Sequence, residues 1–575
     1  MRLLRQILAL LQPRQRRKGA WITLLVFANS LLDFCSLAGF VSIVTAVLSP
    51  GAFQSNVQLQ QFYLWSGADD QRSFLITLTV FLLGFLVIRN VFSIWVARIK
   101  VQFAFDVGNF LSSANLSRFM ARTHADFTES DFASELHRLT TYPISFANNI
   151  LLPLLRCVAE IFVSLLVIGG LVWIEYRIIA LFGAMGLPLF ALYRYRKKML
   201  DNIGLELKVK YPLLLKSGMQ IVEGFPEITV YNKQRYFQER FERANRHFSN
   251  VLVKDQFTQA VTTPVIELFV GMLICSLIVY SVIGGDSPGQ TVFMIGLVAA
   301  AALRMMPSVI RIANAVHQLS TNSYVIEHLK TVNAPSVGCV PLKVETPEFH
   351  KTVSVTGLTI RYRDGTQPLK DVQLTLRKGE KVAITGNSGE GKTTLLLGIL
   401  QLIDSPTGEI RVDGRRITQR AGWWKLIAYV PQSPYLFDGT ILENIAFGSA
   451  TGQVDQSRAQ QILVGLGLGS LLDKLPLGVH TTIGERGVRL SGGQRQRLAI
   501  ARGLYANAQI LLLDEITNHI HSDAITSVFE MLEELARAGK TIIVVSHLVH
   551  DRDFFDTLYR LEDGKLIKLA VKEPV

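Results

Sequence analysis

Six long apolar segments constrain the fold of this 575-residue chain more than any other feature. The hydrocarbon core of a membrane is about 30 Å thick, and a helix crosses it with roughly 20 apolar residues. The composition agrees, because only 18% of the residues are charged, whereas a typical soluble domain carries about 25%. The sequence therefore predicts six membrane-spanning helices, over residues 21–48, 74–97, 150–173, 178–193, 261–283 and 291–315.

The connections between these segments alternate in charge. Residues 1–18 and 194–256 are rich in Lys and Arg, whereas residues 49–73 carry more acidic than basic side chains. Cytoplasmic connections are enriched in Lys and Arg, so we expect both termini in the cytoplasm and the chain in the cytoplasmic (inner) membrane, in contact with its lipids. The net charge of +13 follows from these loops, and without a nucleic-acid-binding motif it predicts no nucleic-acid partner.

Two cytoplasmic connections, residues 98–149 and 194–256, are too long for simple loops and lack clusters of Pro and Gly. We interpret them as helical extensions of the membrane spans, each bent at a short turn such as residues 223–227.

Residues 1–18 predict a short amphipathic helix. Its apolar residues fall on one helical face, opposite Arg2 and Arg5. Such a helix lies on the inner leaflet of a membrane, and a short helix packed against the protein is the alternative. The apolar face consists of Leu3, Leu4, Ile7, Leu8 and Leu11.

A polar stretch that contains Pro, at residues 331–350, has the character of a domain boundary. After it, short β-rich runs alternate with helical stretches, which is typical of an α/β domain. The β-rich runs are residues 381–385, 427–430, 510–513 and 541–545. We therefore divide the chain into an elbow helix (1–18), an all-α six-span transmembrane domain (19–330), a linker (331–350) and an α/β domain (351–575).

Residues 386–393 read GNSGEGKT and fit the phosphate-binding pattern G-x-x-x-x-G-K-[ST]. They follow a predicted strand and precede a predicted helix at 394–400, the context that this motif requires. Backbone N–H groups of the loop and the helix N-terminus bind phosphate oxygens. We expect Lys392 to contact the β- and γ-phosphates of ATP and Thr393 to ligate Mg²⁺. The other expected nucleotide contacts are Gly386, Asn387, Ser388, Gly389, Gly391 and Thr394.

Two further motifs follow. Residues 490–494 read LSGGQ and open a predicted helix at 495–504, which offers a second helix N-terminus to phosphate. Residues 510–515 are aliphatic and end in Asp514 and Glu515, as suits a buried strand whose end faces a metal–nucleotide site.

With these motifs in this order, residues 353–569 resemble the ATPase domain of ABC transporters. The resemblance implies that Asp514 holds Mg²⁺ and that Glu515 polarises the attacking water. It also implies that Gln432 contacts Mg²⁺, that His547 senses the γ-phosphate and that Tyr362 stacks on adenine. Residues 482–487 resemble the exporter segment that contacts the coupling helices. The signature residues that complete the ATP site of a second subunit are Ser491, Gly492, Gly493 and Gln494.

Two positions depart from the ABC pattern. His521 stands where the family has the D-loop aspartate, and Leu548 stands where an arginine commonly follows the switch histidine. The D-loop lies across the subunit interface in that family, so these substitutions bear on the strength or symmetry of the dimer contact. We still expect hydrolysis, because Lys392, Gln432, Asp514, Glu515 and His547 are all retained.

Several ionisable residues lie within or beside the predicted spans, where such residues usually face a cavity. Arg304 and Arg311 are seven residues apart and share a helix face. One interpretation is ion pairing between helical residues, for example of Arg156 with Glu160. The other is an inward-facing basic surface that binds an anionic substrate through Arg304 and Arg311.

Residues 303–312 resemble the half-transporters that flip lipid-linked oligosaccharides. That resemblance implies a substrate with a pyrophosphate group; other lipids, peptides and drug-like amphiphiles are the alternatives.

Together these features predict an exporter-type all-α transmembrane domain with long cytoplasmic extensions, followed by an α/β P-loop NTPase domain. The expected function is ATP-driven export or flipping of an amphipathic, anionic lipid-linked substrate by alternating access, with ATP and Mg²⁺ bound. One chain holds one nucleotide-binding domain, so a dimer is required, and we expect a homodimer. The alternative is a regulatory or catalytically weak half of a heterodimeric exporter for peptides, lipids or drugs.

Overall fold

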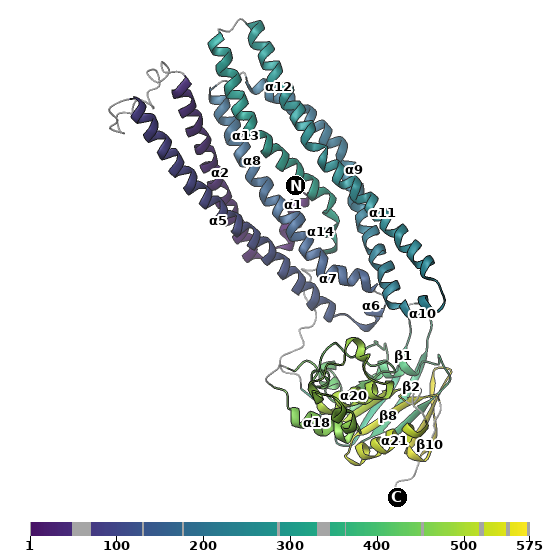
Figure 1. Cartoon of the computed structure of the whole chain (residues 1–575). Helices are drawn as coiled ribbons and strands as arrows, with labels where there is room; N and C mark the ends of the chain where they lie inside the picture. Colours follow the sequence, from purple (N-terminus) through teal and green to yellow (C-terminus); the bar gives the residue numbers. More distant parts are fainter. Residues whose placement is uncertain are drawn as a thin grey trace. The chain divides into compact units, whose positions relative to one another are not determined.

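A computed structural model describes residues 2–48, 71–128, 131–174, 178–284, 288–329, 345–362, 364–449, 453–516, 522–547 and 552–571. The chain divides into two compact units (Figure 1). One comprises Met1–Ala121 and Ser130–Val337, and the other comprises Arg122–Glu129 and Gly338–Val575. Each unit is described by itself below.

The first unit, Met1–Ala121 with Ser130–Val337, is called the membrane unit below. It is built from long helices that lie side by side (Figure 1). Each contains most or all of one predicted span, which confirms the predicted all-α architecture. After the short helix α1 (Arg2–Leu10), the helices that contain the predicted spans are α2 (Pro13–Leu48), α5 (Gln71–Met120), α8 (Leu152–Ile174), α9 (Ile178–Glu223), α12 (Thr262–Gly284) and α13 (Pro288–Thr321).

Four stretches of the described residues are long and apolar enough to cross a membrane: Pro13–Ser36, Ser73–Met120, Phe132–Gly170 and Gln234–Ser276. The fourth and sixth predicted spans lie in α9 and α13, where the structure describes only the backbone over residues 178–193 and 288–304.

Helix α5 shows why the sequence is so apolar. Its inner face buries Phe103, Val107 and Leu111 in the core of the unit, whereas Val80 and Ile94 are among several large apolar side chains on its outer face that stay exposed. Large exposed apolar surfaces are unusual in soluble proteins. This face therefore suits contact with lipid.

The N-terminal helix is shorter than the sequence predicts. Helix α1 ends at Leu10 and α2 begins at Pro13, a residue that favours the first turn of a helix. The Nε atom of Arg16 donates to the carbonyl of Leu8 and so satisfies the end of α1. Ile7, Leu10 and Leu11 are buried against the unit while Leu4 and Leu8 are exposed, so only part of the predicted apolar face is free to meet a membrane.

The long connections are helical, as predicted. Helix α9 ends at Glu223, and Gly224 leads into the short helix α10 (Phe225–Val230), which confirms the predicted bend. The other helical elements that the structure describes in or beside these connections are α6 (His124–Thr128), α7 (Phe132–Phe146), η1 (Ala147–Leu151) and α11 (Gln234–Ala260). The short helix α14 (Ser323–Leu329) follows α13.

The other unit holds two sheets, which confirms the predicted α/β class. An antiparallel sheet has the strand order β2-β1-β4-β5, with β1 (Thr352–Ile360), β2 (Leu369–Arg377), β4 (Glu409–Val412) and β5 (Arg415–Arg416). A six-stranded sheet has the order β10-β9-β3-β8-β7-β6. Its strands are β3 (Lys381–Thr385), β6 (Ile427–Val430), β7 (Ile510–Asp514), β8 (Thr541–Ser546), β9 (Thr557–Glu562) and β10 (Lys565–Val571).

Strands β3, β8, β7 and β6 run parallel, and every residue of β7 and β8 is buried. Parallel strands covered on both faces are continuous apolar runs, which is why these strands could be predicted. The accompanying helices are α15 (Lys392–Ile399), α16 (Arg420–Trp424), α17 (Ile441–Ile445), α18 (Gln456–Gly465), α19 (Gly469–Lys474), α20 (Gly492–Tyr505) and α21 (Ser522–Arg537).

Candidate nucleotide-binding site

The residues predicted to bind and hydrolyse ATP follow the carboxyl ends of four neighbouring parallel strands. The phosphate-binding loop follows β3, His547 follows β8, Glu515 follows β7, and Gln432 follows β6. These strands lie in the order β3-β8-β7-β6. Because the carboxyl ends of parallel strands meet at one edge of a sheet, ligands of open α/β folds bind there.

The phosphate-binding loop depends on glycine at the start of α15. Gly391 is the N-cap of this helix with φ = 96°, a left-handed conformation that glycine adopts freely. A Cβ atom at this position would also lie 3.2 Å from Pro368. The loop can therefore turn its N–H groups toward a ligand only with glycine here.

Lys392 is buried and lies across the loop. Its Nζ donates to the carbonyl oxygens of Gly386 at 2.9 Å and Asn387 at 2.8 Å. Burial lowers the pKa of Lys392, and the nearby carboxylates of Glu515, Glu390 and Asp514 oppose that shift. The ammonium-bearing side chain of Lys392 thus lies where the loop would receive phosphates.

The opposite end of α15 is held by two neighbouring indoles. Trp423 Nε1 donates to the carbonyl of Ile399, and Trp424 Nε1 donates to that of Leu400, each at 2.7 Å. Both carbonyls belong to the last turn, where the C=O groups have no N–H partner within the helix. Sequence reasoning missed this pair, which ties the segment before β6 to the phosphate-binding helix.

Asp514 ends β7 in a buried position that fits a metal ion. Its Oδ1 is buried and has no hydrogen-bond partner among the described residues, whereas Tyr429 donates to Oδ2 at 3.4 Å. Burial, and to a smaller extent the charge of Glu515, raises the pKa of Asp514, and the nearby side chains of Thr393 and Tyr429 oppose the rise. A buried carboxylate oxygen without a donor, next to a threonine hydroxyl, matches the all-oxygen ligand set that Mg²⁺ prefers.

Tyr429 was not predicted as a site residue. It lies on β6 opposite Leu512 of β7, two residues before Pro431. Its place on the strand beside Asp514 was the available signal, but its orientation toward Asp514 depends on the packed sheet.

Glu515 and His547 contact each other. The Nε2 atom of His547 lies 2.7 Å from Oε1 of Glu515. Glu515 has φ = 51°, a conformation that is uncommon outside glycine and that is often found at functional sites. The structure therefore brings Lys392, Glu515 and His547 together, as the motif order predicts.

Tyr362 lies beside the start of α15. Its hydroxyl is 2.9 Å from Oγ1 of Thr394, and 41% of the residue is exposed. An aromatic ring fixed at one end and open to solvent can stack on a base.

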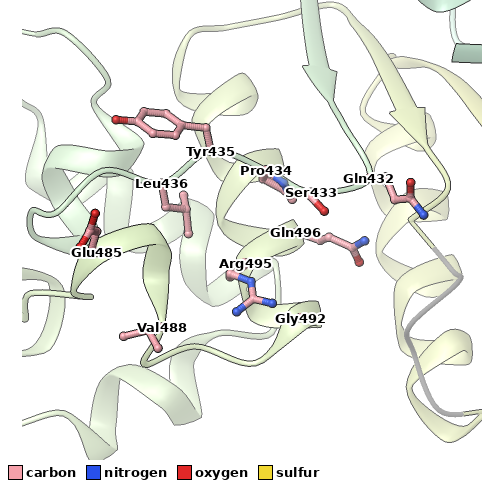
Figure 2. A pocket seen from close by; sticks show the side chains of 10 residues that line it. All are labelled: Gln432, Ser433, Pro434, Tyr435, Leu436, Glu485, Val488, Gly492, Arg495 and Gln496. Carbon is pink, nitrogen blue, oxygen red and sulfur yellow. The ribbon is translucent and has the colours of Figure 1, made fainter. Parts of the chain in front are cut away.

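The signature motif begins α20. Ser491 is its N-cap, and a capping box joins Ser491 and Gln494 in both directions. Gly492 lines a cavity of about 560 Å³ that Gln432 also lines. Figure 2 shows Gln432 on one side of this cavity and Glu485 and Val488 on the other.

Some predicted site features lie outside the described residues. These are the D-loop at 517–521, which includes His521, and Leu548. The side chain of Arg304 also falls outside them.

Arg311, the other predicted substrate contact, forms an ion pair in the membrane unit. Its Nε donates to Oε1 of Glu160 at 2.6 Å, and its Nη2 donates to Oε2 at 3.1 Å. The sequence suggested Arg156, on the same helix, as the partner of Glu160. Among the ion pairs of the described residues, Glu160 instead pairs with Arg311 of α13. Arg89 pairs with Asp33 in the same unit, so ion pairing between helices is present at both sites.

Residues 369–518 match the family described as ABC transporter. A solved structure of a bacterial Atm1-family ABC exporter with ATP bound aligns with a TM-score of 0.76 and 20% sequence identity, over 96% of this chain and 94% of that one. The chain therefore has the fold of that exporter, with an apolar helical unit and a domain that matches the ABC transporter family in one polypeptide.

More specific likenesses come from bacterial relatives. The ATP-dependent lipid A-core flippase of Alkalilimnicola ehrlichii is 31% identical over 390 residues, which are 65% of this chain and 63% of that protein. The protein of the same name from Bordetella pertussis is 26% identical over 513 residues, which are 88% of this chain and 81% of that protein. The match to the first of these relatives spans less than two thirds of its length.

Proposed function

We propose that this chain hydrolyses ATP and exports or flips an amphipathic, anionic lipid-linked substrate across the cytoplasmic membrane. The observation that carries the proposal is the meeting of Lys392, Glu515 and His547 at adjacent strand ends, in a chain whose other unit is a bundle of apolar helices. That the relatives are lipid flippases supports a lipid as substrate.

Each nucleotide-site residue has a distinct role in this proposal. Lys392 and the loop N–H groups bind phosphate oxygens, and Tyr362 stacks on adenine. Thr393, Gln432 and Asp514 would hold Mg²⁺, which neutralises phosphate charge when bound. Glu515 orients the attacking water and accepts its proton, and His547 fixes Glu515 through the contact at Nε2.

Transport requires two copies of the nucleotide-binding domain. We infer that Ser491, Gly492, Gly493 and Gln494 complete the ATP site of the second subunit, because one chain carries one signature motif and one phosphate-binding loop. ATP binding closes the pair, and the helical extensions carry that closure to the membrane spans, with both termini in the cytoplasm. Hydrolysis resets the assembly.

The substrate site lies on Arg311, together with Arg304. The Arg311 guanidinium already binds a carboxylate in the two-pronged geometry that also suits phosphate. An anionic headgroup, such as a lipid-linked pyrophosphate, would take the place of Glu160 there. Glu160 then acts as the resting counter-ion of the empty site.

A second candidate is a regulatory half that needs a different partner subunit. The observation that favours it is His521 at the D-loop aspartate position. The test is ATP hydrolysis by the purified chain in lipid nanodiscs, beside Glu515→Gln and His521→Asp. Hydrolysis that Glu515→Gln abolishes supports the self-sufficient homodimer. Negligible hydrolysis that His521→Asp restores refutes the homodimer and supports the second candidate.

A further inference from the structure

The phosphate-binding loop carries a carboxylate of its own. Glu390 lies between Gly389 and Gly391, and its Oε2 accepts from the backbone N–H of Asn387 at 2.7 Å. Its Oε1 accepts from Nδ2 of Asn387, also at 2.7 Å. Both distances are shorter than the usual N–H···O distance of about 2.9 Å, as expected for an ionised acceptor. The two bonds form a clasp within the loop.

The clasp places negative charge over the start of the loop. A Cβ atom on Gly386 would lie 2.7 Å from Oε2 of Glu390, so the carboxylate lies over this glycine. Lys392 donates to the carbonyl of the same residue. The lysine therefore shares its surroundings with Glu390 as well as with Asp514 and Glu515, which also interact with it electrostatically.

Three carboxylates surround the ammonium of Lys392. Those of Glu390, Asp514 and Glu515 all interact with it electrostatically. Asp514 and Glu515 have roles in the proposed reaction, but Glu390 has none there. Nucleotide phosphates would bring further negative charge to the same loop, and like charges at short range repel.

We propose that Glu390 sets the nucleotide affinity of this site, as an anion built into the loop that opposes phosphate and makes binding depend more strongly on Mg²⁺. The inference rests on the proposed ATP site. Glu390 is half-exposed, so its repulsion is screened by salt. A weaker hold on phosphate also favours the release of product.

The test measures the affinity of the full chain in lipid nanodiscs for a fluorescent ATP analogue, with and without Mg²⁺, at low and high salt. Glu390→Gln keeps the shape of the side chain and removes its charge. We expect it to tighten the dissociation constant about 3- to 10-fold at low ionic strength and about 2-fold or less in 0.5 M salt. We expect the increase in affinity caused by Glu390→Gln to be larger without Mg²⁺ than with it.

Two control variants make the result specific. Glu409→Gln removes an equal charge from β4, where Glu409 pairs with Arg411 and Arg416, and is expected to leave the dissociation constant unchanged. Lys392→Ala is expected to abolish binding, which shows that the signal reports this loop.

The outcomes separate this inference from the proposed function. If the unaltered chain binds no nucleotide, the proposed ATP site itself fails. If that chain binds but Glu390→Gln has the same affinity, a weaker one, or a gain that salt does not reduce, the inference about Glu390 is overturned while the ATP site stands.

Discussion

The imidazole of His547 lies between Glu515 and Lys392. Its Nε2 is 2.7 Å from Oε1 of Glu515, and its Nδ1 is 3.2 Å from Nζ of Lys392. Nδ1 also lies 3.2 Å from the carbonyl oxygen of Gly386. When Nε2 carries the proton, Nδ1 accepts from the ammonium, and when Nδ1 carries a proton, it donates to that carbonyl. One ring thus joins the residue assigned to activate water to the residue assigned to bind phosphate.

Removing the carboxylate charge of Glu515 should separate ATP binding from hydrolysis. We expect Glu515→Gln to bind nucleotide while ATP turnover falls about 10²- to 10⁴-fold, because that is the usual contribution of a positioned general base. Phosphate release measured beside nucleotide titration checks this. Turnover within about tenfold of the unaltered chain would show that another group activates the water.

The pair of Arg311 and Glu160 predicts opposite effects for two substitutions. Glu160→Gln leaves the guanidinium without its counter-ion, so we expect stimulation of ATP hydrolysis at lower concentrations of a phosphorylated amphiphile. Arg311→Ala should remove that stimulation. The measurement is ATPase rate against amphiphile concentration in nanodiscs, with a neutral amphiphile for comparison.

A suitable control for Arg311 is Arg235→Ala on α11, whose side chain is 92% exposed and pairs only with Glu239 four residues along among the described ion pairs. Equal loss of stimulation in both variants would argue against a specific anion site at Arg311.

Gly204 marks a close approach of α9 and α13. A Cβ atom there would lie 2.4 Å from the carbonyl oxygen of Thr321, closer than packed atoms allow. We expect Gly204→Ala to destabilise the membrane unit by about 1–3 kcal/mol, as overpacking usually does. Gly271→Ala in α12 is the matched control, because nothing lies within 4 Å of its Cβ position. Melting of the full chain in detergent measures both, and equal melting temperatures would contradict the prediction.

Two histidines, the buried His137 and the half-buried His328, predict acid sensitivity of the membrane unit. His137 packs against the rings of Tyr142 and Tyr211. His328 stacks on the ring of Tyr142 as well, so both histidines contact the same tyrosine. Burial, followed by the nearby His328, lowers the pKa of His137. Burial, followed by the charges of Lys208 and Arg138, lowers the pKa of His328, and Glu327 opposes this.

The sign of the pH effect follows from these directions. The folded chain binds fewer protons at His137 and His328 than the unfolded chain, whose histidines titrate near pH 6.5. Their contribution to stability is therefore fully present above about pH 6.5 and is lost as the pH falls through the lowered pKa values. The melting temperature should drop between about pH 7 and pH 5.

A substitution at His137 tests this origin. Its Nδ1 is buried and has no hydrogen-bond partner in the part of the chain that the structure describes. His137→Phe therefore keeps an aromatic ring and removes the titration. We expect a shallower fall of melting temperature with acid, whereas His247→Gln, at an exposed position on α11, should leave the slope unchanged. An unaltered slope in His137→Phe would assign the acid sensitivity elsewhere.

Local patterns account for much of what the sequence predicts. Strands β3 and β6 have the predicted bounds, and β7 and β8 extend one residue further, because short apolar runs beside turn residues are recognisable without knowledge of packing. The meeting of Lys392 with His547 follows from motif order on a parallel sheet.

Contacts between segments far apart in the chain could not be predicted from the sequence. Spacing along one helix suggested Arg156 as the partner of Glu160, yet Glu160 binds Arg311, which is 151 residues away. Spacing reveals neighbours within a helix but not which helices pack together. The clasp of Glu390 on Asn387 depends in the same way on side-chain conformation inside a turn.

The central place of β8 in its sheet has a consequence for how this protein tolerates change. Thr385 of β3 pairs with Ser546, and Asp514 of β7 pairs with Val545, so the spacing of Lys392, Glu515 and His547 is set by strand register. Divergence in the segment that joins β7 to β8, where His521 lies, can therefore accumulate without altering that spacing. The residues proposed to act on ATP and the segment proposed to bear on the choice of partner subunit can then change independently of each other.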